Sequence, residues 1–142
     1  MARSLTSSDV QLRRNVAVTL DVLGGGWWFH DRYPSRIDIS AALPALMTAL
    51  GDSDKDVRAY AASDLGDVGS KAAPAVRRLI ELLGDPNEGV RNNVCIGLKG
   101  IGPAAKAALP ALRQALADPS EDVRRFARLA IASIEGRLRA VG

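Results

Sequence analysis

The chain has 142 residues, 47% of them hydrophobic and 25% charged, with a formal net charge of +3. This length fits one domain, and the apolar content is too high for a disordered chain. One cysteine excludes a disulfide scaffold and a cysteine-rich zinc module, and one histidine excludes a multi-histidine metal site. No uncharged apolar run approaches the roughly 18 residues of a membrane span, and the N-terminal residues lack the apolar segment of a signal peptide. We expect a cytoplasmic protein.

An internal repeat organises the sequence. The dipeptide Val-Arg recurs at 57–58, 90–91 and 123–124, and leucine recurs at 50, 83 and 116. Both series give a period of about 33 residues, a spacing typical of helical repeat proteins. Each unit predicts two helices joined by a short turn, the first helix ending at the recurring leucine. The single domain, 1–142, therefore divides into a half repeat (7–24), an aromatic insertion (25–38) and three full repeats (39–70, 71–103 and 104–138).

The half repeat comes first in the chain. Residues 12–24 align without a gap with residues 90–102, which predicts a second helix capped by Ser7. Only six residues precede Ser7, too few for a partner helix. This end of the stack is therefore expected to lack a helix. That is consistent either with a complete protein or with a piece of a longer solenoid.

The insertion holds four of the six aromatic residues, Trp27, Trp28, Phe29 and Tyr33. Side chains this large and apolar bury against something, and three interpretations remain open. The loop covers the unfinished end of the stack, inserts into a partner or over a ligand, or packs on a second copy, so that the half repeat and the loop form a homodimer. His30 beside Asp31 permits acid–base chemistry, but without a third partner we favour a hydrogen-bonded loop histidine.

The three full repeats carry the same signals for the second helix. We expect each second helix to begin at an aspartate N-cap, namely Asp52, Asp85 and Asp118. Glu88 and Glu121 would complete capping boxes, and Gly69 and Gly102 would end two of these helices in a left-handed conformation.

Arginine recurs with these aspartates, at Arg58, Arg91 and Arg124. The alternatives are an anion-binding ladder and a structural ladder in which the arginines pair with acids of the neighbouring repeat. Strict recurrence in every unit favours the structural ladder. Cys95 aligns with alanines, which predicts a small buried residue rather than a nucleophile. Asp64 is an acid at a position where the other repeats have Thr19, Gly97 and Ala130. We expect it to lie either at the edge of the core or towards a partner.

The pattern Asp-x-x-x-x-Val-Arg, small apolar residues and then Leu-x-x-Ile-Gly, as at 85–91 and 98–102, resembles the HEAT-like repeat. The nearest variety is the bacterial one named after phycobilisome lyases, and the resemblance covers roughly residues 7–24 and 41–136. It implies an all-α fold, a short right-handed, armadillo-like α-solenoid of about 3.5 helical hairpins. It implies little about activity.

Positions on the second helices that do not recur carry more information on function. They mix arginine, amide and aromatic side chains, a mixture that suits protein recognition. We therefore predict a non-catalytic protein- or peptide-binding scaffold, without a metal or cofactor, that uses its concave face and the aromatic insertion. The candidate binding residues are Arg14, Trp27, Trp28, Phe29, Tyr33, Tyr60, Asn92, Asn93 and Arg125.

Two alternatives belong to other classes of function. Residues 104–142 hold seven basic and four acidic groups, which suits phosphate contacts in a nucleic-acid-binding HEAT-like module. The residues for those contacts are Arg125, Arg128, Arg137 and Arg139, with base stacking on Trp27 and Trp28. A polar outer face of a terminal helix explains the same arginines, and interruption by Glu121, Asp122 and Glu135 favours that explanation. The second alternative is a small chromophore-lyase-like or other enzyme, for which no catalytic motif is present.

Overall fold

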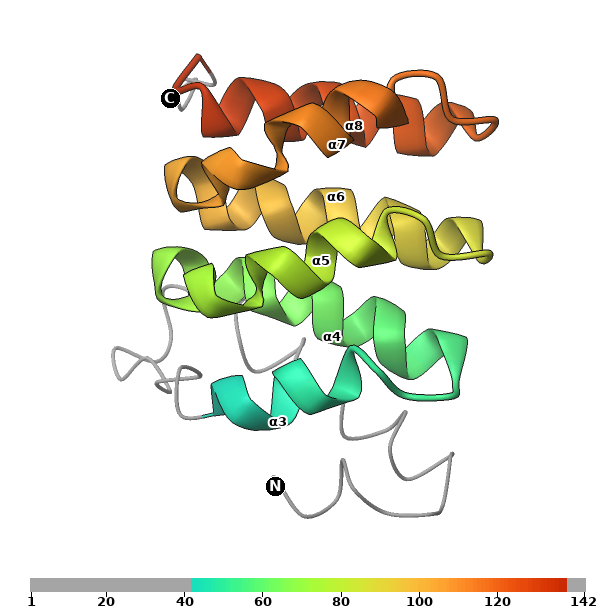
Figure 1. Cartoon of the computed structure of the whole chain (residues 1–142), viewed down its shortest axis with the longest axis vertical. Helices are drawn as coiled ribbons and strands as arrows, with labels where there is room; N and C mark the ends of the chain where they lie inside the picture. Colours follow the sequence, from blue (N-terminus) through green and yellow to red (C-terminus); the bar gives the residue numbers. More distant parts are fainter. Residues whose placement is uncertain (1–41, 138–142) are drawn as a thin grey trace, which may run out of the picture.

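The computed structural model describes residues 42–137, and these residues form an α-solenoid of three helical hairpins. Figure 1 shows the hairpins stacked along the long axis of the molecule, from α3 at one end to α8 at the other. The prediction of an all-α solenoid is confirmed, since the described residues are helices and turns. The half repeat at 7–24 and the insertion at 25–38 lie outside the described residues.

The first hairpin pairs α3 (Leu43–Ala49) with α4 (Lys55–Val68). The second joins the 3₁₀ helix η2 (Gly69–Ala75) and α5 (Val76–Leu82) to α6 (Glu88–Ile101). The third joins the 3₁₀ helix η3 (Gly102–Ala108) and α7 (Leu109–Ala115) to α8 (Glu121–Ile134). The first α-helix of each hairpin thus has seven residues and the second has fourteen.

The second helices begin later than the sequence predicts. Their N-caps are Asp54, Asn87 and Ser120, whose side chains accept hydrogen bonds from backbone N–H groups of the first turn. The prediction that Asp52, Asp85 and Asp118 are the N-caps is therefore wrong, and so are the capping boxes. Glu88 and Glu121 are instead the first residues of their helices.

The physical reason is a local turn. The side chains of Asp52, Asp85 and Asp118 each accept a hydrogen bond from the backbone N–H two residues later, at 2.8–2.9 Å. This bond forms an Asx turn before the helix. Proline after two of these aspartates supports the same turn. The prediction that Gly69 and Gly102 end α4 and α6 is confirmed, and both have a positive φ, +74° and +71°. Their ψ values of −143° and −142° differ from those of the αL cap that the sequence predicts.

The core runs through the stack between the first and second helices. Leu46, Leu79 and Leu112 of the first helices are at most 1% exposed. Val57, Val90 and Val123 on the second helices are fully buried. Both sets recur with the period of the repeat, so each hairpin adds an equivalent layer to one continuous core.

Helices α4 and α6 approach each other very closely. A Cβ atom at Gly97 would overlap the carbonyl oxygen of Ala62, and one at Gly100 would lie 2.7 Å from the Cα of Gly66. Between α6 and α8 the residue equivalent to Gly97 is Ala130, so those helices must lie farther apart at that level. The Ser133 hydroxyl donates a hydrogen bond of 2.8 Å across that interface, to the carbonyl of Lys99.

Candidate protein-binding face and inter-repeat ladder

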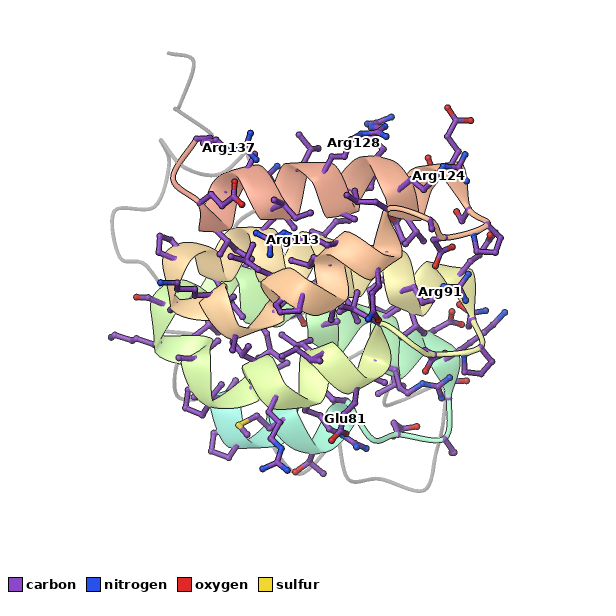
Figure 2. The ribbon with its side chains drawn as sticks, turned by 45° about the horizontal axis from the view of Figure 1, so that its top comes forward. Glu81, Arg91, Arg113, Arg124, Arg128 and Arg137 are labelled. Atoms are coloured by element: carbon purple, nitrogen blue, oxygen red, sulfur yellow. The ribbon has the colours of Figure 1, made fainter. Side chains whose placement is uncertain are left out.

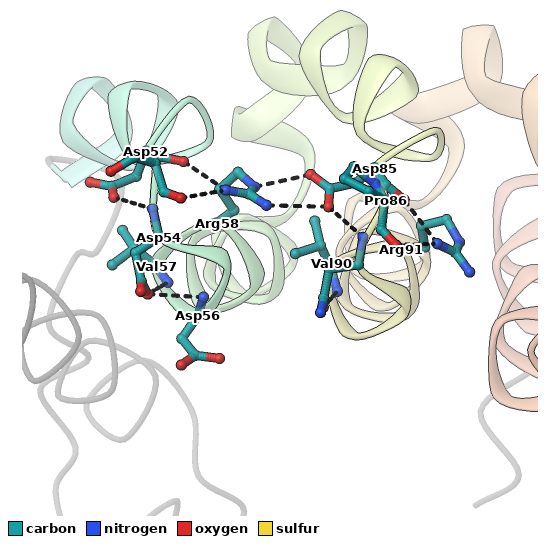
Figure 3. A network of polar contacts seen from close by, with 11 residues as sticks. Asp52, Asp54, Asp56, Val57, Arg58, Asp85, Pro86, Val90 and Arg91 are labelled. Carbon is teal, nitrogen blue, oxygen red and sulfur yellow. Dashed lines mark hydrogen bonds and ion pairs between the residues drawn. The ribbon is translucent and has the colours of Figure 1, made fainter.

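The recurring arginines connect successive hairpins. Arg58 donates through Nε and Nη2 to the two carboxylate oxygens of Asp85, at 2.9 and 3.3 Å. Its Nη1 donates to the carbonyl oxygens of Asp52 and Ser53, at 2.9 and 3.1 Å. Figure 3 shows this guanidinium between the turns of the first and second hairpins. One arginine thus ties its own turn to the turn of the next unit.

Arg91 repeats this arrangement one unit along. It donates through Nε and Nη2 to Asp118, at 2.8 and 3.2 Å. In both pairs the arginine side chain is 15–16% exposed and the aspartate 5–9% exposed. The structure thus places these four residues in inter-repeat ion pairs, and the guanidinium edges that an external anion would need are occupied.

Asp118 shows the electrostatic consequence. Burial raises the pKa of its carboxyl group, but hydrogen bonds from Arg91 and from the N–H of Ser120, with the charges of Arg91 and Arg124, outweigh burial. The net effect holds the pKa of Asp118 below its ordinary value. The hydrogen bond to Asp118 in turn raises the pKa of Arg91, against the opposing effect of burial. Both shifts favour the ion pair in the folded protein.

The non-recurring positions of α4, α6 and α8 form what we call the second-helix face, with two columns of residues. One column holds Tyr60, Asn93 and Phe126, all half-buried. The other holds Ala59 and Asn92, also half-buried, and the exposed Arg125, whose guanidinium lies 5.1 Å from the centroid of the Phe126 ring. Phenol, amide, aromatic and guanidinium groups are therefore all accessible on this face.

Hydrogen bonding differs between the two amides of this face. Asn93 donates through Nδ2 to the carbonyl of Gly89, at 2.8 Å, within its own helix. The Oδ1 atom of Asn92 is buried and accepts no hydrogen bond from the residues that the structure describes. A buried acceptor that receives no hydrogen bond costs stability.

The predicted phosphate-contacting arginines do not form one uniform patch. Arg125 and Arg128 are exposed on α8, whereas Arg137 pairs with Glu135 at 2.6 Å. Glu135 also lies 3.3 Å from Arg113. Figure 2 shows Arg124, Arg128 and Arg137 spread along the outermost helical layer. Arg139 lies outside the described residues.

Cys95 and Asp64 both belong to the interior. Cys95 is fully buried, and burial, with a smaller contribution from the charge of Asp118, raises the pKa of its thiol to about 12. Asp64 is 1% exposed, which places its side chain inside the protein rather than on an open surface.

Several candidate residues fall outside the part of the chain that the structure describes. These are Arg14, Trp27, Trp28, Phe29, His30 and Tyr33. Among residues 42–137, no three His, Cys, Asp or Glu side chains are grouped as metal ligands. In the same range, every helix is too short or too polar to span a bilayer.

Stacked helical hairpins that share one continuous core define the class of α-solenoid repeat proteins. A family profile described as HEAT repeats matches residues 43–132, and the chain belongs to that family. A comparison with curated proteins finds no match.

Solved structures with the same fold include designed and natural proteins. An engineered protein has a TM-score of 0.76 at 22% identity, and a designed armadillo repeat protein has a TM-score of 0.74 at 20% identity. The complex of CpcE and CpcF of phycocyanin lyase from a Nostoc species has a TM-score of 0.58 at 26% identity. These alignments cover 96%, 94% and 95% of this chain, but only 61%, 62% and 64% of the other chains.

Proposed function

We propose that the chain is a non-catalytic scaffold that holds a protein or peptide on the second-helix face. The observation that carries this proposal is the contrast between two kinds of position. The ladder arginines and the central core leucines and valines repeat in every hairpin, whereas one column of the face consists of Tyr60, Asn93 and Phe126. Stacking does not require that variation, and tyrosine, phenylalanine and arginine are suitable anchors for a partner.

The size of the face indicates the size of the occupant. Packed helices lie about 8–10 Å apart, so three second helices present a face roughly 20 Å wide. An extended peptide rises about 3.3 Å per residue, so six or seven residues cross it. The half-buried Asn92 and Asn93 belong to α6, the middle one of the three second helices, and would lie under the centre of such a peptide.

Site-specific photocrosslinking tests this proposal. A benzophenone amino acid replaces Tyr60 or Arg125 on the face and, as a control, the exposed Arg77 on α5. The variants are expressed and irradiated in the cells in which the chain naturally occurs. We expect one protein adduct from positions 60 and 125, and none from position 77.

The same experiment separates the alternatives. Adducts that nuclease treatment removes would support the nucleic-acid-binding function instead. Equal adducts from all three positions, or none at 60 and 125, would contradict binding on this face. An adduct with a small molecule, detected by mass spectrometry, would favour a lyase-like enzyme.

A further inference from the structure

The third arginine of the ladder is held like the other two. Arg124 donates through Nη1 to the carbonyl oxygens of Asp118 and Pro119, at 2.7 and 3.1 Å. Arg58 and Arg91 make the same pair of bonds to the carbonyls of their own turns. The guanidinium is therefore fixed in the same orientation in all three hairpins.

What differs is the other edge of the guanidinium. In Arg58 and Arg91, Nε and Nη2 bind both oxygens of an aspartate in the next turn. Within the described residues no further hairpin follows α8, and Nε and Nη2 of Arg124 donate to no acceptor there. A planar, oriented pair of donors with a matching carboxylate in both equivalent positions is a preformed carboxylate site.

The surroundings of Arg124 also differ from those of Arg58 and Arg91. Position 128 is equivalent to Ala62 and Cys95, which are fully buried between successive second helices. Arg128 is exposed in that position, one helical turn from Arg124. A neighbour packed as closely as α6 on α4 would have to bury this charge, which is costly.

An exposed apolar residue lies at the same end of the stack. Leu116 follows α7 and is 38% exposed, whereas its equivalent Leu50 is fully buried. We call Leu116, Arg124 and Arg128 the outer face. It combines one exposed apolar side chain with two arginines, and arginine is enriched at protein interfaces.

We propose that the outer face binds a protein partner through an aspartate or glutamate carboxylate, which takes on Arg124 the place that Asp85 takes on Arg58. The outer face adjoins the second-helix face on α8, where Arg125 follows Arg124, but it consists of different residues and does not depend on the function of that face. A single carboxylate fits better than a nucleic-acid backbone, because Glu121 and Asp122 are exposed at the start of α8 and would repel a run of phosphates.

The experiment uses the full chain labelled with ¹⁵N and follows the Nε–Hε signals of its arginines by NMR. The probe is a 16-residue peptide of alternating aspartate and serine. We expect the Arg124 signal to move towards the signals of Arg58 and Arg91 as the peptide is added. We also expect Arg124→Lys to weaken binding about tenfold, because lysine cannot form the paired hydrogen bonds.

Controls make each outcome decisive. Arg77→Lys makes the same substitution at an exposed residue of α5 and should leave binding unchanged. Thermal unfolding verifies that both variants fold. No binding, or equal binding by Arg124→Lys, would overturn the proposal. Equal dependence on Arg124 for a dT16 oligonucleotide would show a phosphate site. An Arg124 signal already shifted in a sedimenting dimer would assign the face to a second copy.

Discussion

At the residue scale, position in the stack decides what each charged group does. The carboxylates of Asp85 and Asp118 both orient their own turn and receive an arginine from the preceding hairpin. The exposed pair of Arg78 and Glu81, 2.6 Å apart, connects residues of one helix only. Partly buried pairs between units should therefore matter more to stability than exposed pairs within a unit.

Asp118→Asn tests this for the second ladder pair. We expect the free energy of unfolding to fall by about 1–3 kcal/mol at pH 7, because Arg91 loses a charged acceptor. The pKa of Asp118 is lowered in the folded protein. Its contribution is therefore fully present above the ordinary aspartate pKa of about 3.9 and is lost as the pH falls through the folded value.

Urea unfolding of wild type and variant at pH 7 and pH 3 measures this contribution. The difference between them should be smaller at pH 3. Glu81→Gln is the matched control on an exposed pair and should change little at either pH. A difference that is the same at both pH values would contradict the assigned role of the Asp118 charge.

Cys95 provides a second prediction at this scale. Its side chain is fully buried and its thiol pKa is raised to about 12, so at pH 8 little thiolate is present and little of the thiol is accessible to a reagent. Labelling of the native protein by a disulfide reagent should be about a thousandfold slower than in denaturant, where the pKa is about 8.5. Ser70→Cys adds an exposed thiol as a positive control, and it should react at once. Rapid labelling of native Cys95 would show that the α6–α8 interface opens readily.

At the element scale, side-chain size sets the spacing between helices. Glycine at 97 and 100 lets α6 lie against the backbone of α4, whereas alanine and serine occupy the equivalent positions of α8. The spacing between α4 and α6 is therefore smaller than that between α6 and α8, although the sequence repeats with one period.

Gly97→Ala should lower the free energy of unfolding by about 3 kcal/mol, because the new methyl group would overlap the Ala62 carbonyl. Gly84→Ala is the control, since a Cβ there would meet only the Glu81 carbonyl, at 3.5 Å. That change should stay within about 0.5 kcal/mol. Chemical denaturation measures both. Equal effects would indicate that α4 and α6 separate at little cost.

At the scale of the whole molecule, each hairpin contacts only its neighbours, so stability should vary along the stack. Helix α6 packs between α4 and α8, whereas the outer side of α8 carries the exposed Arg128. The amides of α6 should therefore open only with most of the stack, and those of α8 by local unfolding.

Native-state hydrogen exchange checks this expectation. Protection free energies in α8 should be lower than in α6, and Arg91→Lys should widen the gap because it weakens the tie to the Asp118 turn. As an internal reference, amides in α4 of the same variant should change less. Identical protection in α6 and α8 would show that the described hairpins unfold as one cooperative unit.

The sequence by itself determined the period, the hairpin architecture and the glycines that end α4 and α6. These features depend on local spacing, because the apolar periodicity of a helix and the glycine that ends it involve residues close together in the chain. It also contained a missed signal: Asp54, Asn87 and Ser120, all good capping residues, stand at equivalent positions of the three full repeats.

Only the tertiary structure decided where the second helices begin, how closely α4 approaches α6, and which arginine keeps a free edge. Each depends on groups far apart in the chain. Asp85 is engaged by Arg58, 27 residues earlier, and the backbone of Ala62 explains why residue 97 lacks a side chain. Arg124 has the same sequence context as Arg58 and Arg91, and differs because no carboxylate among the described residues reaches it.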